Sequence, residues 1–305
     1  MSEDASVLAV DIGGGTTKLA LVSNAGVIRN WQSILTQGPI GADFMEEILT
    51  RCRLLQRQAE FKVVGVSAAV AGFVSATGAL EFNANLPWLE QTPIRTILAD
   101  GLGLPVIVDA DSNAACVAEY VFGEGRNASR FLCLTGGTGL GVGMIANGRL
   151  LRIAHGCMGD AGHVVVSPEG PECSCGGRGC AEALLSTASL SARYALAEGR
   201  SGAGFRDLVD DAHAAKPGAR ALLEEAGYWL GIAAASLASI FLPDRIAVAG
   251  GLSHAGDAFF TAAQESFHNH GGRFPLARAS LVRATTGEHA TLLGAAASFF
   301  HPELL

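Results

Sequence analysis

Four potential metal ligands lie close together in the glycine-rich segment GHVVVSPEGPECSCGGRGC. His163 is followed ten residues later by Cys173, and Cys175 and Cys180 come soon after it. One imidazole and three thiolates form the ligand set of a closed tetrahedral zinc site, which leaves no position open for a substrate. The sequence therefore predicts a structural zinc ion that holds a segment with too few apolar residues to pack unaided. Free cysteines in a core are the alternative, and the Ser, Gly and Arg residues between the cysteines disfavour it.

Two glycine-rich loops each follow a short apolar stretch, one in DIGGGTTK after residues 7–10 and one in LTGGTGLGVG after residues 131–134. Backbone amides in such loops can approach phosphate oxygens closely, although a single glycine loop is equally typical of a structural hairpin turn. The repeated order of strand, loop and strand indicates an internal duplication that offers both loops to one phosphate-bearing ligand. The first loop leads into a strand and no GKS or GKT follows it, which disfavours Rossmann and P-loop folds.

Carboxylates stand where predicted strands end. Asp11 follows the first strand and could hold a magnesium ion through water, while Lys18 either adds positive charge or is a surface residue. Asp109 and Asp111 follow a predicted strand at 105–108 and share one face of it. Either could accept the proton of an attacking hydroxyl in phosphoryl transfer, and the other could cap the next helix. The residues alone do not rank the two.

The elements that must position these groups follow from the apolar patterns. Further strands are predicted at 18–23, 63–69 and 246–249. Helices are predicted at 42–60, 113–122, 219–241 and 288–299, the third ending before Pro243. The pattern indicates an α/β protein. The other four cysteines, Cys52, Cys116, Cys133 and Cys157, have apolar neighbours and are predicted to lie in the core.

Length and charge exclude several classes of protein. With 305 residues, 49% hydrophobic and 16% charged, the chain is long enough for two lobes around a cleft. Acidic residues outnumber basic ones 29 to 21 without a basic run, which disfavours nucleic acid as a partner. No signal peptide and no long apolar span is recognisable, so we expect a cytoplasmic protein that does not bind membranes.

In this order, the motifs resemble those of the ROK family (repressors, open reading frames and kinases) along essentially the whole chain. DIGGGTTK and LTGGTGLGVGMIANGRL resemble its two phosphate loops, GHVVVSPEGPECSCGGRGC its zinc signature, VAGGLS its adenosine-side loop and GEHATLLGAA its closing helix. The resemblance implies a two-lobed actin/hexokinase-like (ribonuclease H-like) duplicated ATPase fold with a zinc-bound loop. It places the small lobe at 1–112 with the helix at 288–305, and the large lobe at 113–287 with the zinc loop at 163–180.

The resemblance also implies roles for individual residues. DSNAACVAE matches the segment that carries the catalytic base, which makes Asp111 the base and Asp109 its support. Sugar contacts are implied at Gly72, Asn85, Asn113, Asp160, His163 and Glu182, with His163 using its second ring nitrogen for the sugar. ATP, with Mg²⁺, is expected at Asp11, Gly13, Gly14, Gly15, Thr16, Lys18, Thr135, Gly136, Gly137, Thr138, Gly139, Gly250 and Gly251.

Three positions depart from the family pattern. Asp160 stands where the family usually has Glu, which leaves the identity of the sugar open. Gly15 replaces the usual Thr, and Ala71 precedes Gly72 where Pro is common. Neither the change at Gly15 nor that at Ala71 removes a group that the chemistry cannot replace, because backbone amides bind the phosphates.

The expected function is ATP-dependent phosphorylation of a hexose hydroxyl, the 6-hydroxyl by family precedent, with glucose as the default substrate. N-acetylmannosamine or N-acetylglucosamine is the alternative substrate. A sugar-responsive repressor is disfavoured, because the first strand begins by residue 7 and leaves no room for a helix-turn-helix before it. A non-catalytic sugar-binding or regulatory protein is a further alternative. The family also leads us to expect a homodimer.

Overall fold

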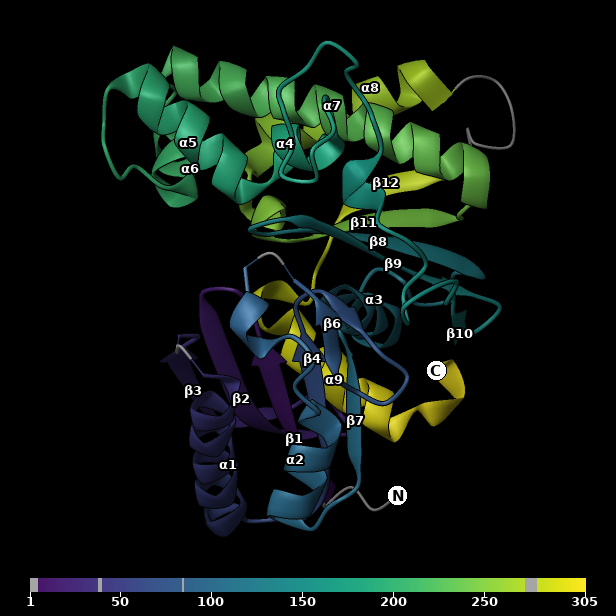
Figure 1. The fold of residues 1–305 in the computed structure, drawn as a ribbon. Helices are drawn as coiled ribbons and strands as arrows, with labels where there is room; N and C mark the ends of the chain where they lie inside the picture. Colours follow the sequence, from purple (N-terminus) through teal and green to yellow (C-terminus); the bar gives the residue numbers. More distant parts are fainter. Residues whose placement is uncertain (1–4, 38–39, 84, 272–278) are drawn as a thin grey trace. The chain divides into compact units, whose positions relative to one another are not determined.

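The computed structural model describes residues 5–37, 40–83, 85–271 and 279–305. The chain forms two compact units with mixed α/β structure, coloured along the sequence in Figure 1. The first unit comprises Met1–Arg126, Gly143–Gly159 and His289–Leu305, and the second comprises Asn127–Val142 and Asp160–Glu288. Within the described part of the chain, no helix has the length and apolar character needed to cross a membrane.

The first unit is built on a five-stranded sheet with the order β3-β2-β1-β4-β7. Its strands are β1 (Ala5–Ile12), β2 (Thr16–Ser23), β3 (Ile28–Leu35), β4 (Lys62–Val70) and β7 (Val106–Ala110). The central strand β1 is buried along its whole length, pairing antiparallel with β2 and parallel with β4. A strand that is buried on both faces has a continuous run of apolar residues, which is why the segment SVLAV could be predicted to be a strand.

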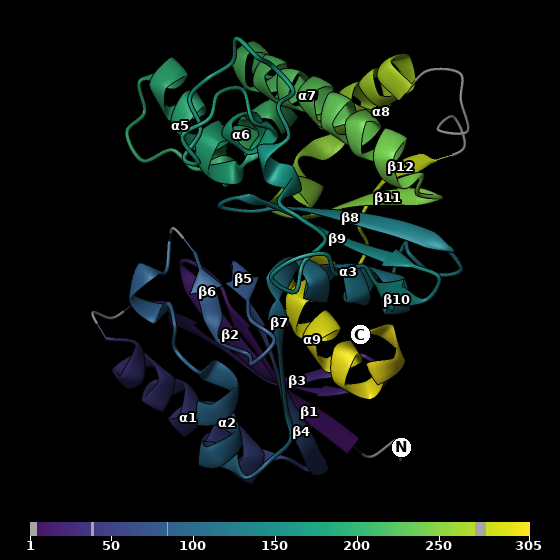
Figure 2. The same ribbon diagram turned by 45° about the vertical axis from the view of Figure 1, so that its right-hand side comes forward.

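Each face of this sheet is covered by helices, as Figures 1 and 2 show. Leu8 and Val10 of β1 face the core shared with α1 (Gly41–Gln58) and α2 (Ile94–Leu102). Val7 and Ala9 face the opposite core, shared with α9 (Ala290–Phe300) and Ala114. This alternation follows from the two-residue period of a strand. A small hairpin of β5 (Phe73–Val74) and β6 (Leu80–Phe82), followed by η1 (Pro87–Leu89), lies between β4 and α2 in the chain.

Helix α3 (Asp111–Phe122) belongs to the first unit, whereas the resemblance had placed residues 113–122 in the large lobe. The reason is its packing on α9. A Cβ atom at Gly294 of α9 would lie 1.6 Å from the carbonyl oxygen of Ala114, so only glycine permits this approach. Residues 143–159 also join the first unit, again in contrast to the predicted boundary at 112.

The second five-stranded sheet has the order β10-β9-β8-β11-β12. Its strands are β8 (Arg130–Gly136), β9 (Leu140–Ala146), β10 (Arg149–Leu150), β11 (Arg245–Gly250) and β12 (Ser280–Arg283). Strand β11 runs parallel to both β8 and β12. β8, β11 and β12 belong to the second unit, β10 belongs to the first, and the boundary between the units falls within β9. The second unit further contains η2 (Ala161–His163), α4 (Ala181–Leu185), α5 (Thr187–Glu198), α6 (Phe205–His213), α7 (Pro217–Phe241), η3 (Gly251–His254) and α8 (Gly256–Gly271), and it ends within η5 (Gly287–His289).

The two sheets have the same strand order. When the strands of each sheet are numbered along the chain, both sheets run third, second, first, fourth, fifth. This repetition confirms the predicted α/β duplication. The predicted strands and helices are present, with ends shifted by at most two residues. Helix α3, for example, begins at Asp111 rather than residue 113, and α9 is preceded by η5. Cys52, Cys116, Cys133 and Cys157 are buried, as predicted.

Candidate active site and metal centre

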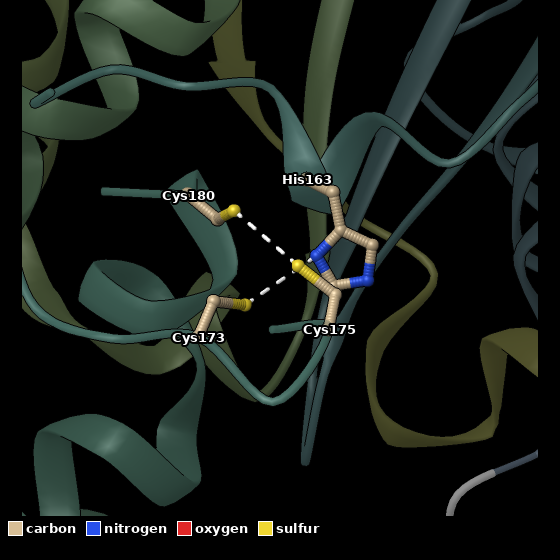
Figure 3. Close-up of side chains that lie close together, drawn as sticks. All are labelled: His163, Cys173, Cys175 and Cys180. Carbon is tan, nitrogen blue, oxygen red and sulfur yellow. Dashed lines mark hydrogen bonds between the residues drawn. The ribbon is translucent and has the colours of Figure 1, made fainter. Parts of the chain in front are cut away.

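The four predicted metal ligands converge in the second unit, as Figure 3 shows. His163 ends η2, Cys173 and Cys175 lie in the following loop, and Cys180 precedes α4. Their potential ligand atoms all lie within 4.8 Å of one another. Nδ1 of His163 is 3.5 Å from Sγ of Cys173, and Sγ of Cys175 is 3.7 Å from Sγ of Cys180. Atoms bound tetrahedrally at ~2.1–2.3 Å would be ~3.4–3.8 Å apart, so this geometry fits zinc.

Backbone hydrogen bonds hold the loop in this shape. The N–H of Cys173 donates to Gly177, and the N–H of Ala181 donates to Val164, which brings the two ends of the loop together. The N–H of Gly177 also donates to Sγ of Cys175 and is the main cause of that thiol's lowered pKa. Burial raises the pKa of Cys180 to about 12. Because metals bind thiolates, a cation must supply the charge that stabilises a buried Cys180 thiolate.

The second ring nitrogen of His163 faces a protein carboxylate. Its Nε2 atom lies 3.5 Å from Oδ2 of Asp160. A carboxylate on the second nitrogen of a metal-binding histidine is a common arrangement that orients the ring. The pKa of Asp160 is raised, chiefly by burial, and the charge of His163 partly offsets that rise. The described geometry therefore pairs His163 with Asp160, whereas a direct contact between His163 and a sugar stays a prediction.

Glu182 connects the metal loop with the second glycine loop. Its Oε1 accepts a hydrogen bond from Oγ of Ser174 at 3.2 Å, and its Oε2 accepts one from the N–H of Leu140 at 3.0 Å. Ser174 stands between two of the cysteines, so the cysteine loop and the second glycine loop meet at one carboxylate. Sequence reasoning assigned Glu182 to the sugar and did not anticipate this connection.

The second glycine loop follows β8 and lies beside the loop after β11. The side chain and the N–H of Thr187 both donate to the carbonyl of Gly137, each at 2.8 Å. Gly250 has a φ of +71°, and a Cβ atom there would lie 2.5 Å from the carbonyl oxygen of Gly136. The structure thus brings two predicted nucleotide loops together, 135–139 and 250–251. Oγ1 of Thr135 is buried without a hydrogen-bond partner among the described residues.

The first glycine loop connects β1 to β2 in the first unit. The N–H of Gly13 donates to the carbonyl of Thr16, and Asp11 stands opposite Lys18 in the strand register. A Cβ atom at Gly15 would have no neighbour within 4 Å, so the departure from Thr leaves open space. Asp11 is 8% exposed and accepts a hydrogen bond from Oγ1 of Thr291. Burial raises the pKa of Asp11, and the bond from Thr291 and the charge of Lys18 counteract it.

The structure distinguishes the two candidate bases. Both oxygens of Asp109 accept hydrogen bonds from protein groups, including the guanidinium of Arg152. Asp111 is the first residue of α3 and only partly buried, and its Oδ1 accepts the N–H of Ser112 at 2.7 Å. Burial, reinforced by the negative charge of Asp11, raises the pKa of Asp111 to about 7. A general base works best with a pKa near the working pH, which favours Asp111.

The predicted sugar ligands of the first unit differ in exposure. Asn85 is exposed and lies beside the first glycine loop, with its Cβ 3.2 Å from the position of a Cβ on Gly14. Gly72 has a φ of +105°, beside Asn83. Asn113 is fully buried, and its side-chain N–H groups donate to Asp109 and to the carbonyl of Gly156. Asn113 therefore has no amide hydrogen left for a sugar hydroxyl in this conformation.

The chain matches the ROK family model over residues 7–301. It belongs to the ROK family. Glucokinase from Streptomyces coelicolor is 32% identical over 95% of this chain and 96% of its own length. Glucokinase from Halalkalibacterium halodurans is 30% identical over 93% and 92%. A ROK family glucokinase from Streptomyces griseus, solved in complex with glucose and AMPPNP, has a TM-score of 0.83 at 30% identity over 95% of this chain and 98% of that one.

The ROK family contains regulators as well as kinases. The xylose repressor of Bacillus spizizenii is 28% identical over 67% of this chain, which corresponds to only 51% of the repressor. N-acetylmannosamine kinase from Citrobacter koseri is 33% identical over 61% of this chain and 63% of that kinase. The glucokinases therefore match the chain over a larger share of both lengths than these two relatives do.

Proposed function

We propose that this ROK protein is an ATP-dependent sugar kinase that transfers the γ-phosphoryl group to the 6-hydroxyl of glucose, with Asp111 as general base. The observation that carries the proposal is the environment of Asp111. This partly buried carboxylate has its pKa raised to about 7 by burial and by Asp11, while the neighbouring Asp109 is fully engaged. Phosphoryl transfer requires such an acceptor for the hydroxyl proton, together with groups that position the phosphates.

Residues of both units have roles in this proposal. Asp11 would hold Mg²⁺ through water, and the loops at 13–16, 135–139 and 250–251 would bind ATP through backbone amides. Asn85, Gly72, Asp160, His163 and Glu182 would recognise the sugar. The kinase class is supported by the glucokinase relatives that match nearly the whole chain. The His163, Cys173, Cys175 and Cys180 cluster would hold a structural zinc ion, and we also propose a homodimer.

The substrate proposal can be tested with a panel of sugars. ADP release would be measured with MgATP and each of glucose, mannose, N-acetylmannosamine and N-acetylglucosamine. We expect the highest kcat/KM with glucose. A clear preference for N-acetylmannosamine would instead favour the second candidate, which the Citrobacter koseri relative supports. Binding of a sugar without any turnover would favour a regulatory protein and contradict the kinase proposal.

A further inference from the structure

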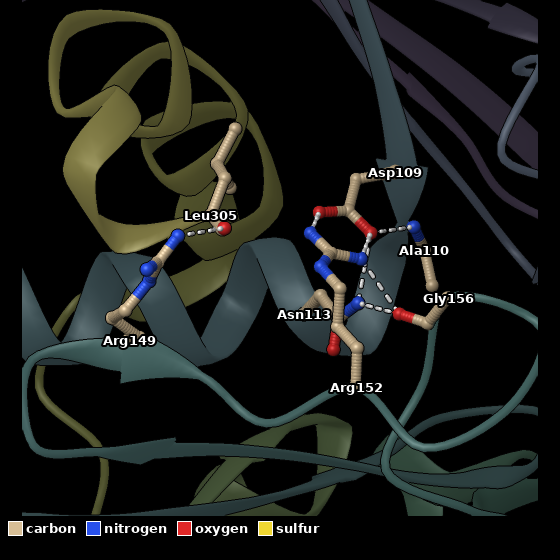
Figure 4. Close-up of polar contacts among 7 residues, drawn as sticks. All are labelled: Asp109, Ala110, Asn113, Arg149, Arg152, Gly156 and Leu305. Carbon is tan, nitrogen blue, oxygen red and sulfur yellow. Dashed lines mark hydrogen bonds and ion pairs between the residues drawn. The ribbon is translucent and has the colours of Figure 1, made fainter.

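The carboxylate of Asp109 is the centre of a buried polar network, drawn in Figure 4. Oδ1 accepts the N–H of Ala110 at 2.8 Å, the side chain of Asn113 at 2.8 Å and Nη1 of Arg152 at 3.0 Å. Oδ2 accepts Nη2 of Arg152. The side chain of Asp109 is 8% exposed and that of Arg152 32%. Removing one partner of such a pair leaves a buried charge without compensation, so the two residues act as a unit.

The same donors also bind the carbonyl oxygen of Gly156. It accepts Nη1 of Arg152 at 2.6 Å and the side-chain amide of Asn113 at 2.9 Å. Gly156 has a φ of +73°, and a Cβ atom there would lie 2.9 Å from the carbonyl oxygen of Val74 in β5. The segment 151–157 is therefore fixed on one side to the start of α3 and packs on the other against the β5–β6 hairpin.

A second contact links the same segment to the hairpin. Nδ1 of His155 lies 2.5 Å from Oε2 of Glu81 in β6, and the His155 ring packs edge-on against Phe73 of β5. Gly72 and Asn85 lie at the two ends of this hairpin region. Through residues 151–157, the network around Asp109 thus connects the start of α3 with the part of the first unit assigned to the sugar.

The start of α3 lacks an N-cap side chain that would accept a backbone N–H of its first turn. Ala110 is the N-cap residue and has no side chain that could accept a backbone N–H. Asp109 does not cap the helix, but it ties the helix start to β7 by accepting the N–H of Ala110 and the side-chain amide of Asn113. Asp111 is the first residue of the helix, so its position depends on these bonds.

We propose that Arg152 and Asp109 are positioning residues, which hold the base Asp111 and the Gly72–Asn85 region in the geometry that phosphoryl transfer requires. This inference rests on the proposed kinase function. In this proposal Arg152 acts through its hydrogen bonds to Asp109 and to the carbonyl of Gly156, and not on the reacting atoms. Misplacement of a reacting group by about 1 Å can reduce a rate ~100-fold, so loss of this network should affect catalysis more strongly than nucleotide binding.

The test is Arg152→Met, which keeps the length of the side chain and removes the guanidinium. Arg149→Met is the matched control, because Arg149 lies three residues earlier, is exposed, and only donates to the carbonyl of Leu305 at 3.5 Å. We expect kcat/KM for the sugar to fall ~10–100-fold in the Arg152 variant, with KM for ATP changed less than about twofold. The control should retain wild-type kinetics. Hydrogen exchange should become faster at residues 109–113 and 152–157.

A double variant, Asp109→Asn with Arg152→Met, separates positioning from simple charge neutralisation. It removes the unpaired buried charge, so its melting temperature should recover while kcat/KM stays low. Wild-type kinetics in either Arg152 variant would overturn the inference, and so would unchanged exchange at 109–113. If the wild-type enzyme turned over no sugar, the proposed function would fail. The exchange data would then decide the positioning inference by themselves.

Discussion

Replacement of Asp111 by asparagine should make the protein more stable at neutral and alkaline pH, although it removes the proposed base. Burial and the charge of Asp11 raise the pKa of Asp111 from 3.8 to about 7. In the unfolded chain the carboxyl ionises near its ordinary pKa, whereas in the folded protein ionisation is disfavoured up to about pH 7. Folding therefore loses stability as the pH rises through this interval, and asparagine avoids that loss because it never ionises.

The size of this difference in stability follows from the shift in the pKa of Asp111. About three pKa units at ~1.4 kcal/mol each give an upper limit of about 4 kcal/mol above pH 7. At pH 5 the difference should be only ~1–2 kcal/mol, at pH 4 it should be about 0.5 kcal/mol, and it should vanish near pH 3. Asparagine keeps the oxygen that accepts the N–H of Ser112, so the local hydrogen bond is preserved.

The assay is thermal unfolding of both proteins between pH 4 and 8.5, without Mg²⁺ or nucleotide. At roughly 2–4 °C per kcal/mol, the variant should melt ~8–16 °C higher at pH 8 and no more than ~2 °C higher at pH 4. Asp100→Asn, a substitution of an exposed aspartate on α2, is the control and should show no pH-dependent difference. A difference for Asp111→Asn that did not change with pH, or a less stable variant at pH 8, would refute this account of its environment.

Three further outcomes are expected. Asp11→Asn removes the negative charge beside Asp111, so the pH dependence of stability assigned to Asp111 should move to lower pH in thermal unfolding; an unmoved midpoint would disprove the coupling. Removal of metal with a chelator, or Cys180→Ser, should lower the melting temperature and abolish a stoichiometry of about one zinc per chain in elemental analysis, whereas Cys133→Ser should retain the metal. Gly294→Val should destabilise the protein by more than about 3 kcal/mol, because its Cβ would overlap the carbonyl of Ala114; urea unfolding measures this, and a value near zero would contradict the close packing of α3 on α9.

Much of the site could be predicted because it is encoded locally. The four potential metal ligands lie within one short segment, and each glycine loop directly follows an apolar strand, so residue types and spacing were sufficient to predict that these groups lie where the structure has them. Only the family resemblance favoured Asp111 over Asp109 as the candidate base. In the structure both oxygens of Asp109 accept hydrogen bonds from protein groups, whereas Asp111 is not part of that network; its role as base stays a prediction.

Other features could not be predicted because they depend on contacts distant in sequence. Arg152 lies 43 residues from Asp109, and nothing around it distinguishes it from a surface arginine. The division into two units differs from the predicted boundary at 112 because α3 packs on α9 from the other end of the chain, although Gly294 within an apolar helix pattern was a signal of close packing. Strands β5 and β6 have two and three residues, too few to show a period.

The central claim is that Asp111 accepts the proton of the sugar hydroxyl during transfer from ATP. The most direct test compares the rate of sugar phosphate formation by the wild-type protein and by Asp111→Asn, with ³¹P NMR to identify the product at saturating glucose and MgATP. The account predicts a hexose 6-phosphate from the wild type and a kcat reduced at least ~100-fold in the variant, with its fold and metal content intact. A variant that formed the same product at the wild-type rate would contradict it.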